Sequence, residues 1–254
     1  MKIQRTDIYD NGQFLRAPVD LKGNEAAKAI LAYELGKACE SRIARLENKN
    51  FTVIANDCCG SLMYDSLQLK KLSPTCGMTI GRYAFVIFCR HLKEYLSMPV
   101  EVPTEEERKL YPGCKAPIGM LHASDTLPPI GLIFTYYDSL EKARETWYRR
   151  RERVNYDNLF FILNCATEKD EHLLDEFERL PYENKVAFTA LEDRERWKDT
   201  FSFRCFSDGN YHPGYFMDYV LTDSGIFHVL DDFDYVNWLN QGSCSPAGLS
   251  AGGY

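Results

Sequence analysis

The sequence predicts an α/β fold with three layers, in which helices flank a mostly parallel sheet that is Rossmann-like but lacks a dinucleotide fingerprint. Residues 130–164 run as an apolar stretch of strand length, an amphipathic arginine-rich helix and a second apolar stretch. A short helical crossover between two buried strands indicates parallel strands. A helix at 168–180 and a strand at 185–189 continue the same order. No GxGxxG or Walker loop follows any predicted strand, which argues against NAD and P-loop ATP sites.

Three parts are expected along the chain. Residues 1–50 form an N-terminal extension that ends in a long helix, residues 51–240 form the α/β domain, and residues 241–254 form a flexible tail rich in Gly, Ser and Ala. The long helix is predicted at 25–47 because apolar residues recur every four positions, and Asn24 is placed to cap its start.

Shorter apolar runs with local punctuation predict the other elements. The helix at 83–97, for example, carries Phe85, Phe88 and Leu92 on one face. Further helices are expected at 62–69 and from 231 through Trp238, and strands are expected at 51–55, 78–80, 98–102, 118–122, 201–205 and 226–230.

Composition and charge exclude several classes of protein. The formal charge of −7 leaves no basic footprint for nucleic acid. The start lacks the apolar segment of a signal peptide, and no apolar run approaches the roughly 18 residues of a membrane helix. We therefore expect a cytoplasmic chain without membrane insertion. Nine cysteines, an odd number with no CxxC, favour reduced and mostly buried thiols.

The turn at 56–61 is the first candidate site, because ligands of parallel sheets lie beyond the carboxyl ends of the strands. Asp57 is a candidate base or metal ligand, and Cys58 a candidate nucleophile; the alternative is that Cys58 is simply a small buried residue. The residues expected at this edge to bind substrate are Asn56, Ser61, Tyr137, Asn164 and Thr167.

The arginine-rich helix offers a second candidate. Arg150 lies on the apolar stripe of that helix, and Arg150 or Arg153 could bind an anion such as phosphate. The alternative is an ordinary cationic helix end. Because these arginines follow a helix and precede a strand, they are expected at the opposite edge from Asn56 and Cys58, where one small-molecule site could not easily use both.

A third candidate follows the apolar run at 226–230. Asp232 and Asp234 have the Asp-x-Asp spacing with which sugar-nucleotide transferases hold a divalent metal, which would then be the cofactor. The alternative is that one of these carboxylates caps the following helix.

Several stretches resemble a bacterial family catalogued as a domain of unknown function and often labelled exopolysaccharide biosynthesis protein. Residues 147–160 match its W-x-R-R-x-x-R-x-N-x-D-N-L-F pattern, and Asn56, Cys58 and Gly60 match its N-x-C-x-G turn. The chain departs from the family at 136–137, where Tyr-Tyr replaces His-Tyr, and at Thr75 or Cys59, where an aromatic residue is expected. The resemblance implies an α/β fold and a capsule or exopolysaccharide setting.

Two functions are compatible with these patterns. The first is a transferase that acts on a sugar nucleotide or another glycan precursor. The second is a non-catalytic glycan-binding or assembly protein, which would expose an aromatic surface in its C-terminal third. The residues expected on that surface are Tyr211, Tyr215, Phe216, Tyr219 and Tyr235.

Overall fold

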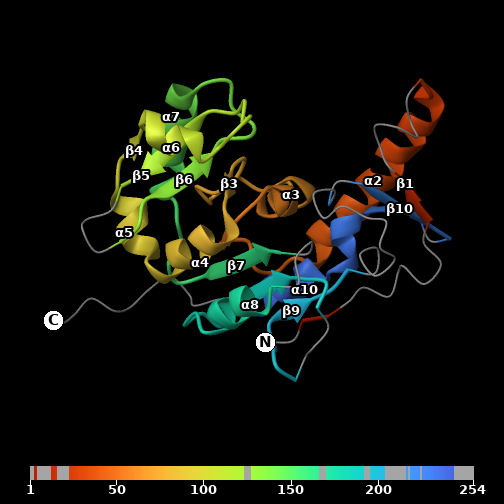
Figure 1. Cartoon of the computed structure of the whole chain (residues 1–254). Coiled ribbons are helices and arrows are strands. Elements are labelled where there is room, and N and C mark those ends of the chain that lie inside the picture. Colours follow the sequence, from red (N-terminus) through yellow and green to blue (C-terminus); the bar gives the residue numbers. More distant parts are fainter. Residues whose placement is uncertain are drawn as a thin grey trace.

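A four-stranded parallel sheet forms the centre of the structure, a computed structural model (Figure 1). Its strand order is β2-β7-β8-β9, and all three pairings are parallel. Val53 pairs with Phe160, so the strands predicted at 51–55 and 159–164 run in the same direction in one sheet, as expected. The strands are β2 (Thr52–Ala55), β7 (Leu159–Asn164), β8 (Lys185–Phe188) and β9 (Thr200–Phe201). The structure describes residues 3–4, 13–15, 23–122, 127–165, 170–191, 195–203, 216, 218–223 and 225–242.

A second sheet is antiparallel, with the order β3-β6-β5-β4. The crossover predicted at 130–164 is therefore wrong in one respect: its first strand, β6, lies in this sheet and does not pair with β7. The intervening helix, α7 (Leu140–Arg151), connects the two sheets. A short buried apolar run looks the same in either kind of sheet, so its partner could not be read locally. The strands are β3 (Thr79–Ile80), β4 (Val100–Glu101), β5 (Ile118–Leu121) and β6 (Ile130–Ile133).

A third, three-stranded antiparallel sheet has the order β1-β10-β11 and packs beside helix α2 (Glu25–Arg45). The capping role predicted for Asn24 is confirmed, since its side chain accepts a hydrogen bond from the Ala27 N–H at 3.0 Å. Arg42 of α2 forms a buried ion pair with Asp231. The strands are β1 (Gln13–Leu15), β10 (Tyr219–Thr222) and β11 (Gly225–His228).

Both faces of the parallel sheet are covered, which confirms the three-layer α/β prediction. Side chains alternate along each strand, so Val53 and Phe160 enter one core while Ile54 and Phe161 enter the other. The helices on the first face are α3 (Cys59–Ser66) and α10 (Tyr235–Asn240), and those on the second are α4 (Arg82–Arg90) and α8 (Glu171–Glu178).

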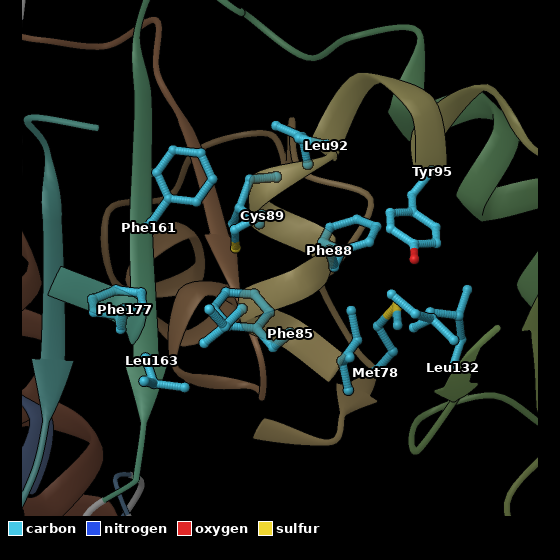
Figure 2. Close-up of a cluster of buried hydrophobic side chains, with 14 of the residues drawn as sticks. Met78, Phe85, Phe88, Cys89, Leu92, Tyr95, Leu132, Phe161, Leu163 and Phe177 are labelled. Carbon is cyan, nitrogen blue, oxygen red and sulfur yellow. The ribbon is translucent and has the colours of Figure 1, made fainter. Parts of the chain in front are cut away.

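Helix α4 lies between the parallel and the antiparallel sheets. Figure 2 shows Phe85 on the side of Phe161 and Leu163, whereas Phe88 lies beside Tyr95, on the side of Met78 and Leu132. One buried cluster contains residues from both sheets, so α4 joins them into one core.

The remaining elements modify the sequence prediction in detail. The helix expected at 83–97 is divided at His91 into α4 and α5 (Leu92–Ser97). The acidic run at 105–107 opens a short helix, α6 (Glu105–Lys109), and a 3-10 turn, η2 (Val229–Asp232), precedes α10. None of the helices that the structure describes combines the length and the apolar composition needed to span a membrane.

Candidate functional site

A cavity of about 410 Å³ lies where α3, the segment leading to β3, the turn after β6 and α7 come together. Its walls combine hydroxyl, phenol and thiol groups with three cationic side chains and one carboxylate. The lining residues are Cys58, Ser61, Leu62, Asp65, Lys71, Cys76, Gly77, Tyr136, Tyr137, Thr146, Arg149 and Arg150.

Ser61 and Gly77 shape the wall of this cavity. The Ser61 hydroxyl accepts a hydrogen bond from the Gly77 N–H at 3.0 Å, which ties the segment before β3 to α3. Gly77 has φ +84°, and a Cβ at this position would lie 3.3 Å from the Tyr137 ring. A glycine is therefore required here for two reasons: the backbone is left-handed, and the Tyr137 ring approaches closely.

Arg150 reaches across to the same segment. Its Nη1 donates to the Cys76 carbonyl at 2.6 Å and to the Tyr137 hydroxyl at 3.0 Å. No described carboxylate forms an ion pair with this guanidinium, which has five N–H donors and lines the cavity. Arg150 thus holds the wall in place and presents a positive charge to any ligand.

The structure brings together two groups that the sequence analysis had separated. Cys58 and Ser61, from the turn after β2, line the same cavity as Arg149 and Arg150. The expectation that one small-molecule site could not easily use both groups is wrong. It assumed that α7 follows a strand of the parallel sheet, but β6 belongs to the antiparallel sheet. The start of β3 pairs with the end of β6, so their flanking turns meet beside α3.

Arg153 lines an adjoining cavity of about 380 Å³. Lys71, Arg149 and Arg150 line both cavities, whereas Lys70 and Arg153 line the second. Arg150 and Arg153, predicted as anion-binding residues, therefore lie along one continuous surface.

Asn56 and Asn164 have a different role in the structure. The Asn164 N–H donates to Asn56 Oδ1 at 2.6 Å, and Asn56 Nδ2 donates to the Asn164 carbonyl at 3.2 Å. The Asn164 amide also donates to the Asp57 carboxylate. Neither asparagine is among the residues lining the cavity. They join the carboxyl ends of β2 and β7, while Thr167 lies outside the described residues.

The geometry does not favour the catalytic roles considered for Asp57 and Cys58. Burial, together with the nearby Asp57 charge, raises the pKa of Cys58 to about 11, so the thiol is protonated at neutral pH. Asp57 accepts the Cys59 N–H at 3.0 Å in the first turn of α3. Cys58 is half-buried and lines the cavity, and the catalytic roles of Asp57 and Cys58 stay predictions.

The two acidic residues considered as metal ligands lie elsewhere, at the start of α10. Asp234 accepts the Asn237 N–H at 3.3 Å and pairs with Arg45 at 2.5 Å, so it is the helix cap of the alternative interpretation. Asp232 is buried. Within the described part of the chain, His, Cys, Asp and Glu form no group of three placed to hold a metal ion.

The aromatic surface expected in the C-terminal third is wrong for two of its members. Phe216 and Tyr235 are only 1% and 2% exposed and belong to the core beneath the parallel sheet. Tyr235 is buried because α10 packs on the first face of the parallel sheet, which is a tertiary contact. Tyr219 is half-buried, and Tyr211 and Tyr215 lie outside the described residues.

Ten residues at the two cavities were not selected from the sequence: Leu62, Asp65, Leu69, Lys70, Lys71, Cys76, Gly77, Tyr136, Thr146 and Arg149. Lys70, Lys71 and Thr146 show no motif, since lysine pairs and helical threonines are common on surfaces. Tyr136 and Arg149 did carry a signal: Tyr136 follows a predicted strand, and Arg149 belongs to the arginine run. What linked them to the site was the position of α7 beside α3, which is a tertiary contact.

The comparisons with known proteins cover the part of the chain that forms the two cavities, but they assign it no reaction. A family described as "Domain of unknown function (DUF1919)" matches residues 30–240, which include all the residues that line both cavities. An uncharacterized protein of Haemophilus influenzae is 28% identical over 200 residues, which cover 78% of this chain and 87% of that protein.

Proposed function

This chain belongs to the DUF1919 family, whose description assigns no reaction, and we propose from its cavity that it is a transferase acting on a sugar nucleotide or another glycan precursor. The proposed setting is exopolysaccharide or capsule biosynthesis, which the family resemblance carried by the motif at 147–160 implies.

One observation carries this proposal: hydroxyl and aromatic groups share a cavity with clustered cations. Ser61, Thr146 and the two tyrosines offer hydrogen bonds and ring faces suited to a sugar. Arginine is the side chain best suited to bind phosphate, because its planar fork can donate two hydrogen bonds at once. The cavity volume of about 410 Å³ lies within the usual range for small-molecule sites.

The same groups suit the chemistry of glycosyl or phosphoryl transfer. Negative charge builds up on a departing phosphate, and fixed cations stabilise that charge in the transition state. Lys71, Arg149 and Arg150 would serve this purpose. Asp65, the carboxylate of the lining, is the group that we assign to accept the proton of the acceptor hydroxyl.

Thermal-shift measurements with a panel of sugar nucleotides, with and without Mg²⁺ or Mn²⁺, test this function. A donor at 100 times its Kd should stabilise the protein by about 2.7 kcal/mol, which is a rise of several degrees in Tm. Release of the nucleotide product in the presence of an acceptor would then establish turnover. No shift and no product with any donor would refute the proposal.

A matched pair of variants locates the effect. Arg149→Gln should weaken donor binding while leaving the fold intact, because Arg149 is exposed and its side chain makes only a 3.4 Å hydrogen bond to Thr146 among the described residues. Lys198→Gln removes the same charge beside β9, at the edge of the parallel sheet farthest from β2, and should bind as the unmodified protein does. Equal losses in both variants would mean that the cavity is not the site.

A glycan-binding protein without catalysis is the second candidate. It is favoured by the neutral thiol of Cys58 and by Tyr136, which is 63% exposed at the cavity and could stack on a sugar ring. Glycan binding without any nucleotide product would support this candidate over the transferase.

A further inference from the structure

The two cavities adjoin each other, and together they are called the groove here. They share Asp65, Lys71 and two arginines, Arg149 and Arg150, so these side chains can contact a ligand in either cavity. Together they offer space for a ligand longer than a single sugar. The character of the lining changes along the groove, which gives it a direction.

At one end the lining is neutral and polar, and at the other it is cationic. Cys58, Ser61 and Tyr136 belong to the first cavity alone, whereas Lys70 and Arg153 belong to the second alone. The second cavity contains five cationic side chains and one carboxylate: Asp65, Lys70, Lys71, Arg149, Arg150 and Arg153.

Asp65 neutralises only one of these five cations. Asp65 pairs with Lys71 at 2.8 Å, but no described carboxylate pairs with Lys70, Arg149 or Arg153. Elsewhere on this acidic chain many cations lie beside carboxylates, as Arg90 does with Glu176. Like charges held together repel each other, so a cluster of this kind is stabilised when an anion binds.

The backbone supports the same arrangement. Gln68 has φ 52°, and among the described residues it is the only non-glycine residue with a left-handed backbone. A left-handed conformation costs a non-glycine residue about 1–2 kcal/mol. It ends α3 with the Leu69 N–H bonded to the Tyr64 carbonyl at 2.9 Å, and the chain then turns so that Lys70 and Lys71 line the cavity with Arg149.

We infer that the ligand is a diphosphate ester whose neutral, hydroxyl-rich group occupies the Cys58–Tyr136 end and whose phosphates lie between Lys71 and Arg153. This inference deepens the proposed function and rests on it for the identity of the sugar. The diphosphate could belong to a nucleotide or to a lipid carrier, since both present the same charged group to Lys70 and Arg153.

Calorimetric titrations with inorganic phosphate and with pyrophosphate test the inference. We expect pyrophosphate to bind at least about tenfold more tightly at low salt, because it can contact the shared and the distal cations together, and the advantage should shrink as salt screens the charges. Equal affinity for the two anions would overturn the inference.

The variant Lys70→Gln/Arg153→Gln removes the distal cations alone. It should reduce pyrophosphate affinity by about fivefold to tenfold and phosphate affinity by less than about twofold, since an exposed charge pair contributes modestly. Lys115→Gln/Lys198→Gln, with the same change in net charge at exposed positions outside both cavities, should leave both affinities unchanged. A similar loss in the two double variants would also overturn the inference.

Two further titrations separate the sources of the diphosphate and the two proposals. UDP binding more tightly than farnesyl diphosphate would assign a nucleotide carrier, and the reverse a lipid carrier; either result supports the inference. If pyrophosphate binds as expected while no sugar nucleotide or glycan precursor is turned over, the diphosphate site stands and the transferase proposal fails. If a donor is turned over but pyrophosphate binds no more tightly than phosphate, the transferase proposal stands and the diphosphate site fails.

Discussion

Arg150 combines a structural and a ligand-binding role because of the shape of its side chain. One nitrogen donates to both the Cys76 carbonyl and the Tyr137 hydroxyl, yet the guanidinium still lines both cavities. A lysine presents a compact point charge and could not span these positions in the same way. The residue that looked out of place on an apolar helix stripe is thus the one that fixes the wall of the site.

Gly77 provides the sharpest test at the scale of one residue. Gly77→Ala should lower the free energy of unfolding by about 1 kcal/mol or more, because it adds a Cβ to a left-handed backbone 3.3 Å from the Tyr137 ring. It should also weaken phosphate binding, since Tyr137 contacts Arg150. Urea unfolding and calorimetry measure the two effects.

Gly36→Ala is the matched control for this prediction. Gly36 lies in the exposed part of α2, and a Cβ there would meet nothing within 4 Å. Alanine should stabilise that helix by roughly 0.5–1 kcal/mol. If Gly77→Ala were equally stabilising, the account of the cavity wall given by Ser61, Gly77 and Tyr137 would be incorrect.

At the scale of the elements, β4, β5 and α6 are connected by one histidine. His122, at the end of β5, lies 2.6 Å by its Nε2 from Glu107 of α6 and 3.0 Å by its Nδ1 from Glu101 of β4. Hydrogen bonding to Glu107 is the main cause that raises the pKa of His122 above its ordinary value of 6.5, with a smaller contribution from Glu101. A protonated imidazole donates from both nitrogens, so the connection is strongest when His122 is charged.

The contacts of His122 with Glu101 and Glu107 predict that the free energy of unfolding depends on pH. Because the folded pKa is raised, the stabilisation is fully present below the unfolded pKa of 6.5 and is lost as the pH rises through the folded value. His122→Gln should therefore lower Tm at about pH 6, by at most about 3 °C for a partly exposed pair, and by less at about pH 9. A difference in Tm that stayed constant or grew with pH would contradict this assignment.

At the scale of the whole molecule, α4 packs between two different sheets, and we expect the two sheets to unfold as one cooperative unit. Its buried residues contact the parallel sheet on one side and the antiparallel sheet on the other (Figure 2). Since the candidate site lies where the flanking turns of both sheets meet α3 and α7, it depends on this union.

Phe88→Ala tests that cooperativity. Phe88 is fully buried, so its truncation should lower the free energy of unfolding by about 3–5 kcal/mol while unfolding remains a single transition. Arg90→Ala on the exposed side of α4 should remove less than about 1 kcal/mol with its ion pair to Glu176. Two separate transitions in circular dichroism, before or after the substitution, would show that the sheets fold independently.

The sequence predicted the elements better than it predicted their partners. The long helix with its Asn24 cap and the parallel pairing of the strands at 51–55 and 159–164 were recovered from local patterns. The two candidate anion-binding residues, Arg150 and Arg153, line the groove, and their binding of an anion stays a prediction. The antiparallel sheet was missed because its strands are only two to four residues long. The lengths of the loops between them also do not show whether the strands pair in parallel or antiparallel.

The amino-acid sequence by itself determined that this is an α/β chain with a cationic helix end and a polar turn after its first buried strand, because apolar periodicity and helix capping are local properties. Only the tertiary structure decided that β6 leaves the parallel sheet and that α7 therefore brings Arg149 and Arg150 beside Cys58 and Ser61. The physical reason is that strand pairing and burial are settled between segments far apart in the chain, where the shared core around α4 outweighs what each segment prefers alone.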